Sequence, residues 1–60
     1  MNQDNPFQIA DNLEEEHGLV CAIITAIEGA YTAEQQKDNH SRTLWKEVER
    51  ILQERLDETW

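Results

Sequence analysis

The residues best suited to chemistry lie in one short stretch, Glu14-Glu15-Glu16-His17, which Cys21 follows after three residues. On a helix, residues three and four positions apart share one side, so His17 would lie beside both Glu14 and Cys21. Imidazole nitrogen and thiolate sulfur are common zinc ligands. Two copies of the chain that meet near a symmetry axis would supply a site of two histidines and two cysteines.

The same stretch has the Glu-x-x-His spacing of carboxylate-bridged di-iron bundles, to which Glu54 or Glu58 would add a carboxylate from a second helix. However, no second spaced pair of ligands follows, a histidine on an apolar seam usually packs, and a lone cysteine behaves as a small hydrophobe. We therefore expect neither metal nor cofactor. Glu14, His17 and Cys21 are the residues that a metal site would use.

Catalysis has little support in the sequence. Ser41 is the only serine, and its neighbour His40 lies in the same polar turn, where adjacent residues rarely face each other as nucleophile and base. The chain has no glycine-rich phosphate loop, and it is too short to enclose a ligand pocket alone. We expect a protein that is not an enzyme.

The length and charge of the chain favour a small acidic module that associates with itself. The 60 residues carry a net charge of -8, and such a short domain buries only about 60% of its unfolded surface, so oligomerisation is a common support. Residues 1–36 contain seven acids and no lysine or arginine. This pattern disfavours direct nucleic-acid binding and favours a partner with a basic surface. We also expect no secretory signal, no membrane span and a cytoplasmic location.

The first predicted helix covers about residues 6–35. Asn5 is the expected N-cap, with Pro6 in the first helical position and Gln8 reaching back to the cap, and residues 1–5 are expected to be largely disordered. Larger residues then recur at spacings of three and four, which is the rhythm of a helix packed along one seam. This seam consists of Ala10, Leu13, His17, Val20, Ile24, Ile27 and Tyr31. Gly18 allows an alternative, in which the helix breaks and the N-terminal segment is separate.

Small residues occupy the opposite side of this helix, at Gly18, Ala22, Ala26, Gly29 and Ala33. Either alanine is present as a good helix former on a solvent face, which we favour, or a second backbone approaches closely there. Two substitutions distinguish the faces. We expect Ile24→Asp to destroy fold and assembly together, and Ala26→Leu to do harm only if a helix packs on the small face.

A second helix is predicted over about residues 41–58, after a polar turn in which Asp38, Asn39 or Ser41 is the N-cap. The whole chain is then a single all-α domain, 1–60, with the two helices forming an antiparallel hairpin. Two helices leave one flank of the seam exposed, so we expect the hairpin to dimerise into a four-helix bundle. The predicted interface comprises Leu13, His17, Val20, Ile24, Ile27, Tyr31, Leu44, Trp45, Val48, Ile51, Leu52 and Leu56.

Three functions are compatible with this architecture. The first is a homodimeric protein–protein interaction or regulatory module, in which Trp60 anchors a partner or simply packs on the bundle end. The second is a nucleic-acid mimic that inhibits a basic DNA- or RNA-binding protein. The third is a metal-binding bundle. Salt dependence separates the first two, and metal content decides the third.

Overall fold

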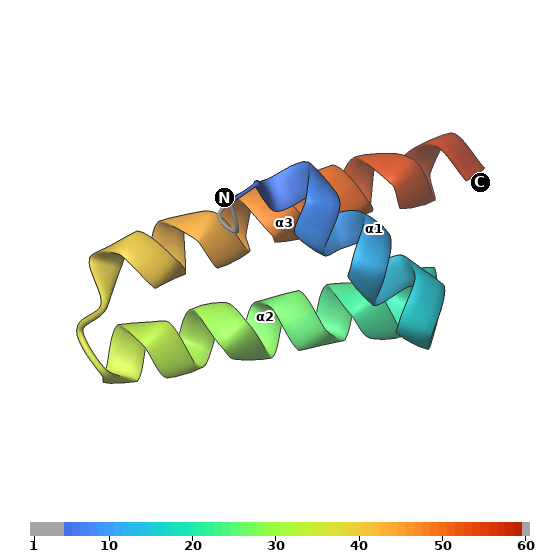
Figure 1. Cartoon of the computed structure of the whole chain (residues 1–60). Helices are drawn as coiled ribbons and strands as arrows, with labels where there is room; N and C mark the ends of the chain where they lie inside the picture. Colours follow the sequence, from blue (N-terminus) through green and yellow to red (C-terminus); the bar gives the residue numbers. More distant parts are fainter. Residues whose placement is uncertain (1–4, 60) are drawn as a thin grey trace.

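The computed structural model describes residues 5–59, which form three α-helices (Figure 1). These are α1 (Pro6–His17), α2 (Leu19–Gln35) and α3 (Asn39–Thr59). α2 and α3 lie side by side, and α1 packs against both at the end of the molecule where α2 begins (Figure 1). The expected all-helical architecture is confirmed for these residues. The expectation of two helices is wrong, because residues 6–35 form two helices rather than one.

The start of α1 agrees with the sequence. The Asn5 side chain accepts hydrogen bonds from the backbone N–H groups of Phe7, at 2.9 Å, and Gln8, at 3.4 Å. Pro6 is the first residue of the helix. The Gln8 side chain does not reach back to the cap as expected but donates to Asn12 Oδ1 at 3.4 Å. The predicted disorder of residues 1–5 lies, apart from Asn5, outside the described residues.

Gly18 separates α1 from α2. Its φ of 83° and ψ of 163° fall in a region that is open essentially to glycine alone. Its N–H donates to the Glu14 carbonyl at 2.9 Å, and its own carbonyl accepts from the Ala22 N–H at 2.9 Å. Gly18 thus takes part in the last hydrogen bond of α1 and the first of α2, although no side chain caps the start of α2 at this residue. This conformation redirects the chain, so that α1 folds back over α3 instead of extending α2.

The turn between α2 and α3 is held by hydrogen bonds at both helix ends. Lys37 has a left-handed φ of 59°, and the Asp38 N–H donates to the Ala33 carbonyl at 2.8 Å, which closes α2. The Asp38 carboxylate accepts from the Ser41 backbone N–H at 3.2 Å and from Ser41 Oγ at 2.8 Å. These bonds lower the pKa of Asp38. Of the three candidate caps, Asp38 is the one used, and α3 begins at Asn39, two residues before the predicted start.

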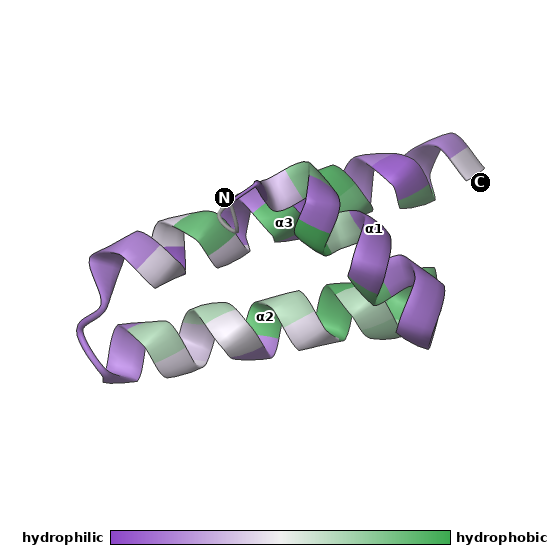
Figure 2. Cartoon of the chain, in the orientation of Figure 1, coloured by the Kyte–Doolittle hydropathy of each residue, from purple (hydrophilic) through white to green (hydrophobic). Residues whose placement is uncertain are grey.

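The core lies where the small face of α2 meets α3 and α1. Hydrophobic residues concentrate along α2 and in the part of α3 that α1 covers, whereas the turn and the α1–α2 junction are hydrophilic (Figure 2). Within residues 5–59, no helix is long and apolar enough to cross a membrane. The buried core residues are Ala10, Ala22, Ile23, Ala26, Ala30, Ala33, Val48, Ile51 and Leu52.

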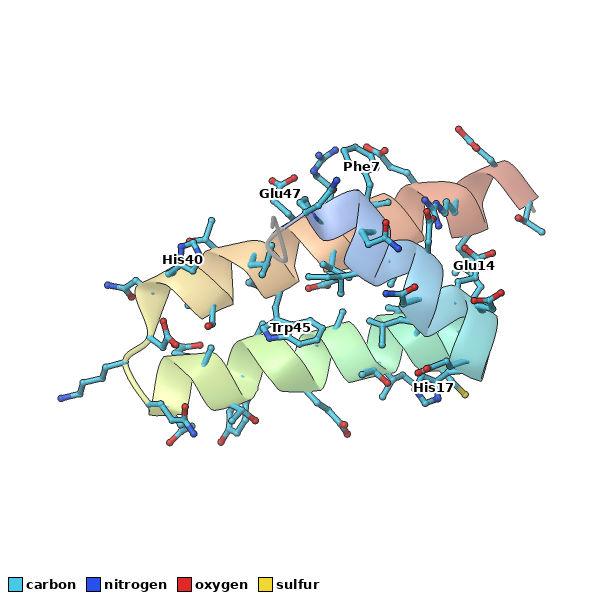
Figure 3. All side chains as sticks on the ribbon, viewed as in Figure 1. Phe7, Glu14, His17, His40, Trp45 and Glu47 are labelled. Atoms are coloured by element: carbon cyan, nitrogen blue, oxygen red, sulfur yellow. The ribbon has the colours of Figure 1, made fainter. Side chains whose placement is uncertain are left out.

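The indole ring of Trp45 lies directly against Gly29 of α2. Trp45 projects from α3 toward α2 (Figure 3), and a Cβ atom built on Gly29 would lie 2.5 Å from Trp45 Cδ2. Such a distance is far below van der Waals contact. The absence of a side chain at Gly29 therefore makes room for the indole.

We expect Gly29→Ala to destabilise the protein, although helix propensity alone favours alanine by about 1 kcal/mol. The displaced indole should make the net loss in the free energy of unfolding about 1–3 kcal/mol, measured by urea denaturation. The same substitution in a Trp45→Leu background provides the control, because the obstructing ring is then absent. There it should be neutral or stabilising, and an equal loss in both backgrounds would exclude the indole as the cause.

Candidate functional site

Glu14, which supplies the carboxylate of the Glu-x-x-His spacing, binds an arginine. Arg55 of α3 donates from Nη1 to Glu14 Oε1 at 2.8 Å and lies 2.7 Å, through Nη2, from Asp11 Oδ1. Hydrogen bonds to Asp11, and secondarily to Glu14, raise the pKa of Arg55. The fork of the guanidinium thus joins two positions one helical turn apart on α1 to α3. Glu14 and Arg55 form a structural contact between helices.

The other candidate ligands do not join Glu14 in a metal site within one chain. His17 ends α1 at the junction with α2, with Nε2 3.8 Å from Glu16 Oε1 (Figure 3). Cys21 is exposed on α2. Of the two candidate di-iron carboxylates, Glu54 accepts a hydrogen bond from Arg50 at 2.9 Å, and Glu58 is exposed. Among residues 5–59, no three His, Cys, Asp or Glu side chains are arranged to hold a metal ion.

The most distinctive surface of the molecule is a row of large apolar residues on α2, which we call the α2 stripe. Its members are Val20, Ile24, Ile27 and Tyr31, with exposed fractions of 59%, 50%, 46% and 64%. They follow one another at spacings of four, three and four, so they lie in line along one face of the helix. Scattered exposed apolar residues are ordinary, but a contiguous row of this kind is typical of an interaction surface.

The α2 stripe corrects the expected orientation of this helix. The seam of large residues was expected to face the neighbouring helix, and the small face was expected to be solvated. Instead Ala22 and Ala26 are fully buried against α3 and α1, while Ile24 and Ile27 are about half exposed. Small side chains let the α2 backbone approach the bulky residues of α3. The large residues of the seam consequently remain outside.

The predicted interface residues of α3 and α1 fall mostly in the interior of the single chain. Val48, Ile51 and Leu52 are buried core residues. Leu13, Trp45 and Leu56 are partly buried and pack against that core, and Leu44 is also partly buried. Of the predicted interface, the α2 stripe and His17 are the exposed members. Trp60 lies outside the described residues.

Two grooves run along the sides of α2. One, of about 230 Å³, borders the α2 stripe and is lined by Ile27 and Tyr31 together with Lys46 and Glu49 of α3. The other, of about 440 Å³, lies beside Trp45 and Gly29, and its walls combine polar and apolar side chains. Ser41 lines this second groove, but its hydroxyl donates to the carboxylate of Asp38 rather than to a base. Ser41 therefore acts in helix capping here.

Comparison of the chain with protein-family models, with curated proteins and with solved structures found no match. The α2 stripe is therefore identified as a candidate site from the geometry of this chain alone. Phe7 is a further exposed apolar residue, at 58%, and it lies outside the predicted interface. The sequence contained one signal for the correct orientation of α2: helix-interior Gly29, whose cost in helix stability requires an offsetting contact.

Proposed function

We propose that this protein is a small interaction module without catalytic activity, which acts as a homodimer formed through the α2 stripe. The observation that carries the proposal is the exposure of four large apolar side chains in line on one helix, while Ala22 and Ala26 on its opposite side have no exposed surface. Association removes this apolar surface from water and adds to a core that is small in a chain of 60 residues.

The proposed dimer is expected to be weak. Four side chains from each copy form a small contact, so we place it near the lower limit for a specific protein interface, which is about 1,000 Å². We therefore expect a dissociation constant of about 1–100 µM, which corresponds to about 5–8 kcal/mol. Both copies carry a charge of -8, so long-range repulsion opposes the dimer. Added salt should strengthen it.

Molar mass measured by sedimentation equilibrium between about 1 µM and 1 mM tests the proposal, because this range spans the expected dissociation constant. The wild type should move from its monomer mass of 7.0 kDa toward twice that value. Ile24→Asp should remain monomeric with unchanged helix content, since Ile24 is half exposed in the monomer. This outcome differs from the loss of both fold and assembly expected from the sequence.

Phe7→Asp is the matched control, because Phe7 is a similarly exposed apolar residue on α1 rather than on the stripe. It should dimerise like the wild type. A wild type that stays monomeric at the highest concentration would refute the proposal. So would an equal loss of association in Phe7→Asp and Ile24→Asp, because the stripe would then have no special role.

The nucleic-acid mimic has less support from the arrangement of charges. Asp11 and Glu14, two of the acids of α1, are paired with Arg55 and so contribute less to an anionic surface. The direction of the salt effect distinguishes the two functions. A mimic should lose affinity for its basic target as salt increases, whereas the self-association proposed above should gain.

A further inference from the structure

We propose that the two copies pair in antiparallel orientation, with α2 against α2, about a two-fold axis that passes between Ile24 and Ile27. This inference rests on the proposed function, which identifies the α2 stripe as the contact surface. It adds how the two copies are oriented. A two-fold interface must bring the same patch of both copies together, so the patch has to be complementary to itself. Two features of the described residues meet this requirement in the antiparallel orientation.

The first feature is the symmetry of the α2 stripe. Its spacings of four, three and four read the same in both chain directions. In an antiparallel pair centred between Ile24 and Ile27, Ile24 of each copy faces Ile27 of the other copy. Val20, the smallest side chain of the stripe, then faces Tyr31, the largest. A parallel pair would place tyrosine on tyrosine and valine on valine. The contact would then be overfilled at the tyrosines and underfilled at the valines.

The second feature is the uneven charge along α2. The end of the molecule that contains the α1–α2 junction also contains the C-terminal part of α3, whereas the α2–α3 turn lies at the other end (Figure 1). Residues 11–17 carry four acids and residues 54–59 carry three acids and one arginine, so the junction end has a charge of -4 - 2 = -6. Residues 34–46 carry three cations and two acids, so the turn end has +1.

The orientation of the pair decides which ends meet. A parallel pair would place the two ends of charge -6 beside each other, at a distance where salt screens their repulsion incompletely. An antiparallel pair places each junction end beside the other copy's turn end, where Lys37 and Lys46 lie. The second copy is thus a better charge complement in the antiparallel orientation. Shape and charge select the same arrangement.

Distances between spin labels on the two copies test the orientation. Cys21, Glu28 and Gln35 are exposed, lie seven residues apart and share one side of α2 beside the stripe. A nitroxide is attached to Cys21, or to a cysteine introduced by Glu28→Cys or Gln35→Cys in a Cys21→Ser background. With a rise of 1.5 Å per residue, antiparallel pairing separates the labelled positions along the axis by about 8 Å at 28, 14 Å at 21 and 28 Å at 35.

Pulsed electron–electron double resonance on the dimer should therefore give the shortest distance between labels at position 28 and the longest at position 35. Equal distances at the three positions would establish parallel pairing and overturn this inference while keeping the proposed function. A shortest distance at 21 or 35 would overturn it too, because the axis would lie elsewhere. A wild type that is monomeric by sedimentation would remove the proposed function itself, and the geometry with it.

Discussion

Ala26→Leu is expected to abolish cooperative folding. Ala26 is fully buried in the cluster that joins α2 to α1 and α3, with no exposed surface. Leucine adds three carbon atoms where the packed neighbours leave no space, and overpacking of this kind costs about 1–3 kcal/mol or more. A domain of 60 residues has only a few kcal/mol of stability to lose. Far-UV circular dichroism during urea titration should show lost helix content or a greatly lowered midpoint.

Val20→Leu is the control for this substitution, since it enlarges an apolar residue of the same helix at a position that is 59% exposed. Its free energy of unfolding should stay within about 0.5 kcal/mol of the wild type. If Ala26→Leu unfolded at the wild-type midpoint, the small face of α2 would be accessible to solvent. The arrangement of the core described above would then be wrong.

Leu52→Ala is expected to cause the largest loss among substitutions that remove atoms from α3. Leu52 is fully buried and lies in the same cluster as Ile23 and Ala26 of α2. Truncation of a buried leucine removes transfer free energy and leaves a cavity, at a cost of about 2–5 kcal/mol. This cost is comparable with the whole stability of so small a domain. The thermal transition should fall steeply or disappear.

Leu44→Ala makes the same chemical change on the same helix at a partly buried position outside the core cluster. Its loss should be clearly smaller than that of Leu52→Ala, because less surface is buried there and a cavity near the surface can fill with water. Equal losses in the two variants would mean that the core extends to the turn end of α3 and does not centre on Leu52.

The local structure of the chain was predictable because local rules fix it. The Asn5-Pro6 start of α1, the polar turn before α3 and the capping by Asp38 depend on hydrogen bonds between residues a few positions apart. The buried residues of α3, Val48, Ile51 and Leu52, follow equally directly from its amphipathic pattern. In both cases the deciding pattern lies within one helix or in the residues beside its start, although the sequence left three residues open as the cap of α3.

The break at Gly18 and the contact of Arg55 with α1 were harder to predict from the sequence. Glycine permits a φ of 83° but does not require it, so the sequence left a continuous helix and a broken helix both open. The choice depends on what α1 gains by folding back, through burial of Ala10 and pairing of Asp11 and Glu14 with Arg55. Those contacts join residues more than 40 positions apart, which no local pattern reveals.

The sequence by itself determined that this protein is helical, where α1 begins, and that α2 has one large and one small apolar face. Only the tertiary structure decided which of these faces is inside. The physical reason is shape: helical periodicity identifies faces, whereas packing depends on how closely two particular surfaces can approach. Trp45 and Leu52 are bulky, so α3 packs against the small residues of α2, and the large residues Val20, Ile24, Ile27 and Tyr31 face outward.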